Sequence, residues 1–360
     1  MANETGSDVL MHLLATSAVE AIKKPAMIFK RNGTYFGHGA DITINLIYVL
    51  LTLLNFIGNG LMIYLIMRHR QLRTPINFFL LNLSVSDIIA GLSIYPFVFL
   101  TNISRLSSKS STLGLVCSLT EGLSVFFVAA GVGLSTLCAV SLYRYVVIRF
   151  PLRALWTRSK RAAKVIVAAM WIISIVVITP SAVTYRYSPQ LDVCVRDWLS
   201  MNHEVYRIAT LLVTIVLPTT FLCLCYLALR LARRKIMVQC GPQSHVHRIQ
   251  MMKRSEQLVF LLIANFFICW TPFFIYWGLA TFTSFFPMTS TGQTKMLQWV
   301  RITVLFSAIN GSVDPVLFAA SNKEIRAKAR KVLFQVLQVR YASTSIVRSR
   351  VKNRFRGLTL

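Results

Sequence analysis

The stretch ITINLIYVLLTLLNFIGNGLMIYLIM, residues 42–67, contains no Asp, Glu, Lys or Arg. Roughly 20 apolar residues in an α-helix are enough to cross the hydrocarbon core of a bilayer, so this stretch predicts a membrane-spanning helix. Six further stretches share its character, although Asp87 and Asp314 interrupt two of them: 74–104, 122–143, 165–185, 208–229, 257–294 and 302–322. The sequence therefore predicts an all-α membrane protein, a bundle of seven transmembrane helices.

The composition supports this fold class. The chain of 360 residues is 55% hydrophobic and only 14% charged, which is too apolar for two soluble domains. This excludes a soluble enzyme, a disulfide-rich miniprotein and a disordered protein. No nucleophile with a neighbouring base stands out in the sequence, and no cluster of metal ligands does, so we expect no enzymatic activity. The apolar pattern predicts helices over these ranges: 44–67, 75–100, 114–147, 163–184, 205–231, 255–283 and 297–320.

The positive charge of the chain is distributed unevenly. Lys and Arg number 39 against 12 Asp and Glu, a net charge of +27, which could indicate a nucleic-acid partner. If the N-terminus lies outside the cell and seven helices alternate in direction, most basic residues fall in cytosolic segments, as the positive-inside rule requires. We therefore expect a multi-pass plasma membrane protein with an extracellular N-terminus, a cytoplasmic C-terminus and no nucleic-acid partner.

Four regions follow from this topology. We expect an extracellular tail over residues 1–43, the seven-helix domain over 44–320, a short amphipathic interfacial helix over 321–338 and a basic cytoplasmic tail over 339–360. The basic residues of the last two regions predict contacts with anionic membrane lipids.

Two further signals agree with this orientation. Acceptor sequons for N-glycosylation fall in segments assigned to the outside, at Asn3, Asn32 and Asn102. Cys117 and Cys194 also fall in outer segments, where an oxidising environment permits a disulfide.

Polar side chains lie deep within the predicted helices. An ionisable residue at bilayer depth is costly and indicates a functional site, so Asp87 needs a reason to be there. Asn59, Asn310 and Asp314 fall at similar depth, and two acids cannot both ionise there without a counter-ion. Either one acid is protonated or a cation lies between them, while a purely structural network remains the alternative for Asn59.

Two other residues mark points of movement or contact. Pro272 removes a backbone hydrogen bond inside the sixth predicted helix and favours a kink there, beside the bulky indole of Trp270. Arg144 closes the third helix at its inner end, where it either has a function or simply extends to the lipid headgroups.

Taken together, these residues and their spacing resemble the rhodopsin-like family of G-protein-coupled receptors over about 41–335. A family motif appears in every predicted span, in the family's order: Gly58-Asn59, Asn82-Leu83-Ser84-Val85-Ser86-Asp87, Cys117 with Arg144, Trp171, Pro218 with Tyr226, Cys269-Trp270-Thr271-Pro272, and Asn310 with Asp314-Pro315-Val316-Leu317-Phe318. The resemblance implies a receptor that binds an extracellular ligand and activates a heterotrimeric G protein, with arrestin left open as a further partner.

The resemblance also assigns roles to residues. It implies a disulfide between Cys117 and Cys194, and a sodium and water pocket formed by Asn59, Asp87, Asn310 and Asp314. It implies an activation switch in which the kinked sixth helix swings outward and an arginine is released to the G protein, formed by Trp270, Pro272, Arg144, Tyr226, Pro315 and Phe318.

The sequence departs from the family pattern at several of these positions. Tyr143 stands where the family has an acid before Arg144, and Met252 stands where some members have a second acid, so we expect raised ligand-independent signalling. Phe318 replaces the family's tyrosine. Glycines replace serines that often complete the sodium site, which leaves sodium binding open: Gly133 and Gly311. The spacing from Cys117 to Arg144 is also longer than is usual for the family.

The ligand is constrained by two absent side chains. Amine-binding members of the family carry an aspartate where Phe126 stands, which argues against a simple amine. Residues 73–83 are similar to the opsins, but opsins need a lysine where Ala308 stands, which argues against covalent retinal. We therefore expect no organic cofactor, and we favour a peptide as the ligand over a small molecule.

Candidate ligand contacts lie near the outer ends of helices three, six and seven. Glu121 is expected to pair with a cationic ligand, and the residues expected to line the pocket are Phe126, Phe127, Phe273, Phe274, Tyr276, Trp299 and Thr303. Two alternatives remain open: a lipid-ligand or opsin-like sensor without the Schiff-base lysine, and a transporter or channel with an ion path through Asp87 and Asp314.

Overall fold

The structure is a computed structural model. It describes residues 27–29, 36–99, 110–120, 122–150, 159–189, 193–196, 203–240, 246–282, 290–321, 323–332 and 334–335. Five predicted features lie outside these residues: the sequons at Asn3, Asn32 and Asn102, the acid Glu121 and the basic tail over 339–360.

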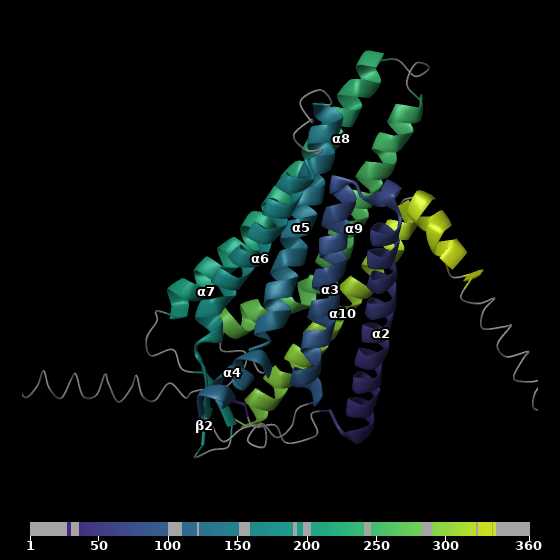
Figure 1. The fold of residues 1–360 in the computed structure, drawn as a ribbon. Coiled ribbons are helices and arrows are strands. Elements are labelled where there is room, and N and C mark those ends of the chain that lie inside the picture. The colour runs from purple at the N-terminus through teal and green to yellow at the C-terminus, as the bar shows by residue number, and fades with distance from the viewer. Residues whose placement is uncertain are drawn as a thin grey trace, which may run out of the picture.

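The described part of the chain is a bundle of long helices, and seven of its helical segments are long and apolar enough to cross a membrane. The prediction of seven spans is thus confirmed, and the chain is a multi-pass membrane protein. Figure 1 shows the helices packed along one another. Their bounds are α2 His38–Arg68, α3 Pro75–Phe99, α5 Ser124–Arg149, α6 Lys160–Ala182, the consecutive segments α7 His203–Leu211, η4 Leu212–Val216 and α8 Leu217–Cys240, then α9 Val246–Phe282 and α10 Ser290–Ser321.

Two helices extend well beyond the predicted limits at one end of the bundle. α8 continues to Cys240 and α9 already begins at Val246, so most of the loop predicted over 232–254 is helical. Both helices project past their neighbours in Figure 1. The prediction was wrong here because apolarity marks only the part of a helix that lies in lipid, whereas Arg, Lys, Gln and Met continue a helix readily in water.

The predicted third helix, 114–147, is not continuous. α4 Ser110–Thr120 ends before α5 begins at Ser124, and Leu123 between them has a left-handed backbone conformation with φ of 46°. A Cβ atom on Gly122 would lie 2.5 Å from the carbonyl oxygen of Ser118, so this tight turn requires glycine. The turn takes up extra residues, which accounts for the long spacing from Cys117 to Arg144.

A small antiparallel sheet covers one end of the bundle, which we call the sheet end. Its strands are β1 Met27–Phe29, β2 Tyr185–Ser188 and β3 Val193–Arg196, in the order β1-β3-β2. The hairpin of β2 and β3 pairs Tyr187 with Cys194, and β1 pairs Phe29 with Cys194 on the other side. A strand of three residues from the N-terminal segment is too short to give a recognisable sequence pattern.

The opposite end of the bundle, the basic end, carries a short helix after α10. Residues 323–332 are helical, with Ile325 completely buried and Ala329 nearly so. Lys328 Nζ donates to Gln71 Oε1 over 3.2 Å, which joins this helix to the turn between α2 and α3. The predicted amphipathic helix after the last span is therefore present.

Candidate functional site

A network of amides joins α2, α3 and α10 in the middle of the bundle. Asn59 Nδ2 donates to the carbonyl oxygen of Gly311 and to Asn55 Oδ1, both over 2.8 Å, and Asn55 Nδ2 donates to the carbonyl oxygen of Asp87 over 2.9 Å. A Cβ atom on Gly311 would lie 3.0 Å from Asn55 Nδ2 and 3.1 Å from Asp87 Cβ. Because Asn55 lies so close, position 311 favours glycine, whereas the family often has serine there. Asn55 belongs to no motif, so its role could not be predicted from the sequence.

Asp314 faces a different helix. Asn265 on α9 directs one amide nitrogen at Asp314 Oδ1 over 2.9 Å, at Asn310 Oδ1 over 3.1 Å and at the carbonyl oxygen of Asn310 over 3.3 Å. This shared donor connects α9 to α10 about two helical turns before Pro272 in the sequence. Asn265 was not predicted, and the single asparagine within the long uncharged stretch 257–294 was the signal that could have found it.

A small cavity of about 30 Å³ lies beside Asp87, with Asn55, Asn310, Gly311 and Ser307 among its lining residues. Asp87 Oδ2 is buried without a hydrogen-bond partner among the described residues, as is Asp314 Oδ2. A buried polar atom without a protein partner is commonly satisfied by water or an ion, and the cavity is large enough for one. A sodium ion therefore fits beside Asp87, where the carboxylate would supply its charge. Asp314 does not line this cavity, since its side chain faces α9.

An aromatic cluster lies above this cavity, toward the sheet end. The Trp270 ring stacks on Phe126 of α5 with centroids 5.7 Å apart, and on Phe266 at the same distance. Phe273 meets Trp270 edge to face at 5.8 Å and Phe127 at 5.3 Å. Aromatic pairs at such separations attract beyond their buried area, so the cluster holds the part of α9 around Pro272 against α5.

A second, larger cavity of about 300 Å³ opens between the helices below the sheet. Four predicted pocket residues line it: Phe127, Phe273, Phe274 and Tyr276. Phe126 lines the small polar cavity instead, and Trp270 lines both cavities. Trp270 therefore lies between a space large enough for a ligand and the polar site beside Asp87.

Two residues on α10 that were predicted to line the pocket do not line this cavity. The helix turns Met296, Leu297 and Val300 toward the large cavity, and Trp299 and Thr303 do not line it. The Trp299 side chain is 39% exposed, and Thr303 is fully buried with its hydroxyl donated to the carbonyl oxygen of Val300 over 3.0 Å. The register of α10 around its axis could not be fixed from one stretch of sequence.

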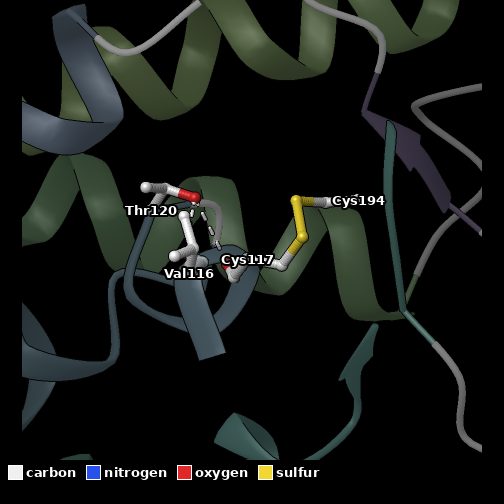
Figure 2. Close-up of a disulfide and its surroundings, with 4 residues drawn as sticks. All are labelled: Val116, Cys117, Thr120 and Cys194. Atoms are coloured by element: carbon white, nitrogen blue, oxygen red, sulfur yellow. Dashed lines mark hydrogen bonds between the residues drawn. A yellow bond between two sulfur atoms is a disulfide. The ribbon is translucent and has the colours of Figure 1, made fainter. Parts of the chain in front are cut away.

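A disulfide joins α4 to the sheet at the sheet end of the bundle. Cys117 of α4 and Cys194 of β3 are bonded, both are buried, and their Cα atoms lie 5.5 Å apart. Figure 2 shows the bridge beside the last turn of α4, where Thr120 donates its hydroxyl to the carbonyl oxygen of Val116 over 2.8 Å. The disulfide implied by the family resemblance is confirmed, and it fixes β3 to α4.

The seven spans, the disulfide and the order of motifs together agree with a match between sequences. The family model described as 7 transmembrane receptor (rhodopsin family) matches residues 58–318, most of the chain. The chain belongs to this family.

Several known receptors are similar to this chain in sequence, at identities below 30%. Somatostatin receptor type 1 of Rattus norvegicus is 26% identical over 329 residues, which cover 88% of this chain and 78% of the relative. Somatostatin receptor type 4 of Rattus norvegicus is 29% identical over 302 residues, with 82% and 74% covered. Somatostatin receptor type 5 of Bos taurus is 26% identical over 310 residues, with 84% and 80% covered.

The basic end of the receptor contains the remaining predicted switch residues. Arg144 of α5 is half-buried, and Phe318 of α10 is almost fully buried. The ring of Tyr226 on α8 packs against Phe260 on α9 with centroids 5.6 Å apart. Pro315 lies within α10, where a Cβ atom on Gly58 of α2 would come within 3.0 Å of its ring.

An ion pair that sequence analysis missed also lies at this end. Glu256 of α9 is 7% exposed and forms a salt bridge with Arg233 of α8, with Arg230 at 3.8 Å. Glu256 follows Met252 by one helical turn, so an acid is present on this helix but faces α8. An acid within a basic segment was the available signal.

Proposed function

We propose that the receptor transduces the binding of an extracellular peptide into activation of a heterotrimeric G protein at the plasma membrane. The observation that carries this proposal is the position of Trp270. This side chain lines the large cavity, and it lies two residues before Pro272 and beside the polar site. A ligand that displaces Trp270 would therefore act on α9 at its bend.

The ligand class rests on two supports. The similar proteins are named as receptors for somatostatin, a peptide. Tyr185 of β2 lines the cavity at the sheet end, so a ligand larger than the 300 Å³ of the cavity could also contact the three-stranded sheet. We propose that Glu121 adds an acidic contact for a cationic group of the peptide.

The orientation follows from charge. We propose that the sheet end is extracellular, with glycans at Asn3, Asn32 and Asn102, and that the basic end faces the cytosol and anionic lipids. There the outward movement of α9 would uncover Arg144 for the G protein, and arrestin would use the same opening. Sodium at Asp87 would favour the closed bundle.

The proposal is tested by screening a peptide library for dissociation of G-protein subunits in cells that express the receptor. Phe273→Ala removes an aromatic wall of the cavity, and we expect it to weaken the active peptide about tenfold or more. Val316→Ala on α10 serves as the control, because Val316 is 65% exposed on the outside of the bundle. The proposal is overturned if surface-expressed receptor couples to no heterotrimer with any peptide, or if both variants respond alike.

A further inference from the structure

The large cavity is uncharged over its entire described lining. None of the described residues that line it is Asp, Glu, Lys, Arg or His. Several of its hydroxyl protons are already donated to helix carbonyls: Ser135 to Gly131, Thr214 to Thr210 and Tyr206 to Val177. A charged group placed deep in this cavity would lose its hydration without a partner, which costs several kcal/mol.

One branch of the cavity extends between α6 and η4. α6 lines it with Ile173, Ser174 and Val177, and η4 lines it with Val213 and Thr214. The two elements are not packed against each other here. η4 has no buried residue, and the buried residues of α6 face α5: Ser174 would lie 3.0 Å from a Cβ on Gly131, and Met170 accepts a weak hydrogen bond from Thr136.

This branch reaches the outer surface of the bundle. Ile173 is 59% exposed and Val213 is 44% exposed, although both also line the cavity. Both residues lie within membrane-spanning segments. The hydrogen bond from Tyr206 Oη to the carbonyl oxygen of Val177, 3.1 Å long, joins α7 to α6 nearer the sheet end. We infer that the cavity opens between these two exposed residues, toward the bilayer core.

We propose that this branch binds an uncharged, mainly hydrocarbon molecule that enters from the bilayer between α6 and η4. The site lies beyond the peptide site of the proposed function and does not depend on it. Hydrocarbon that leaves lipid for the cavity loses no hydration, and it gains contacts with the closely spaced atoms of Ile173, Val177 and Val213. η4 is a π-helical turn, a local widening that occurs often at functional sites, and it directs Val213 and Thr214 to the same space.

The branch also connects to the pivot of α9. The same cavity continues to Phe127, Phe273 and Trp270, so the branch is continuous with the space beside the aromatic cluster. A molecule bound in the branch would change the packing of the aromatic cluster around Trp270. A bound peptide must alter the same packing from the sheet end.

The test uses direct binding, so that it is independent of any peptide or G protein. The full receptor in phosphatidylcholine nanodiscs is exposed to a long-chain primary alcohol that carries a diazirine and a terminal alkyne, and in parallel to the sulfonate of the same chain. After irradiation, labelled positions are identified by mass spectrometry, with and without an excess of unlabelled alcohol. The blocking variant is Val213→Trp. Its control is Leu212→Trp, because Leu212 is 46% exposed but does not line the cavity.

We expect the alcohol to label residues of the branch in a manner that the unlabelled alcohol suppresses. The sulfonate should label them about tenfold less, and Val213→Trp should lower labelling by about tenfold while Leu212→Trp leaves it unchanged. Equal labelling of the two variants, labelling that excess alcohol does not suppress, or equal labelling by the sulfonate would overturn the proposal. If Val213→Trp does not fold, Ile173→Trp against Ile172→Trp makes the same comparison, since Ile172 is 62% exposed and outside the cavity lining.

Discussion

Glu256 on α9 is held by Arg233 on α8, so the acid at the basic end of the sixth span pairs with the fifth span. The family pattern has acids at the positions of Tyr143 and, in some members, Met252, beside or opposite Arg144. The position of Glu256 shows a different connection, between the two helices that project farthest from the bundle in Figure 1.

We predict that Glu256→Gln raises ligand-independent G-protein activation. The substitution removes charge-assisted hydrogen bonds that hold α9 against α8, and a loss of about 1 kcal/mol shifts a two-state population about fivefold. Basal dissociation of G-protein subunits at matched surface expression measures the effect. Arg233→Gln should act alike, and the double variant should add little to either; additive effects of the two changes would contradict a shared ion pair.

Tyr143→Asp should lower ligand-independent signalling several-fold. An aspartate at this position places a carboxylate beside Arg144, and charge-assisted hydrogen bonds contribute about 1.5–3 kcal/mol when partly shielded from water. The same basal assay measures it, with Tyr143→Phe as a control for loss of the hydroxyl. A receptor that shows no signal above empty cells, with Tyr143→Asp no quieter, would contradict the prediction.

Asn265→Leu should raise basal signalling and lower thermal stability. The amide of Asn265 donates to Asp314 and Asn310 on α10, and its loss leaves these acceptors unsatisfied at a cost of about 1–3 kcal/mol. Thermal unfolding in detergent and the basal assay give the two readouts. Ile268→Ala on the same helix is the control, because Ile268 is 70% exposed to the outside; matching losses in the two variants would argue against a specific connection.

Asp41→Asn should lower the melting temperature of the receptor markedly. Asp41 of α2 and Arg301 of α10 form a buried ion pair at 3.4 Å, and Asn45 Oδ1 accepts from the same guanidinium over 2.6 Å. Removal of one member of a buried pair costs about 3–5 kcal/mol, because the other charge stays buried. Arg301→Gln added to Asp41→Asn should recover part of the loss in thermal unfolding, and a double variant less stable than both single ones would refute this account.

Gly122→Ala should reduce the yield of folded receptor. Its Cβ would lie 2.5 Å from the carbonyl oxygen of Ser118, so the turn between α4 and α5 must shift. Size-exclusion chromatography of the solubilised receptor measures folded yield. Gly60→Ala in α2 is the matched control, because a Cβ there meets nothing within 4 Å.

The sequence predicted those features that arise from long or closely spaced patterns. Seven apolar stretches predicted seven spans, and motifs such as Cys269-Trp270-Thr271-Pro272 predicted the family. The break at Leu123 was not predictable, since it depends on one backbone conformation beside Gly122. Asn55, Asn265 and Glu256 are single polar residues whose partners lie on other helices, so only the packing reveals them. The same holds for the rotation of α10 that turns Thr303 away from the cavity.

The three-residue strand β1 has a consequence for receptors shortened at the N-terminus. β3 lies at the centre of the sheet because β1 covers the edge opposite β2. Deletion through Phe29 would leave the amide and carbonyl groups on that edge of β3 open to pairing, and an open edge invites a strand from a neighbouring molecule. A receptor shortened in this way would then tend to self-associate through the open edge of β3, with the sheets of two copies paired at their sheet ends.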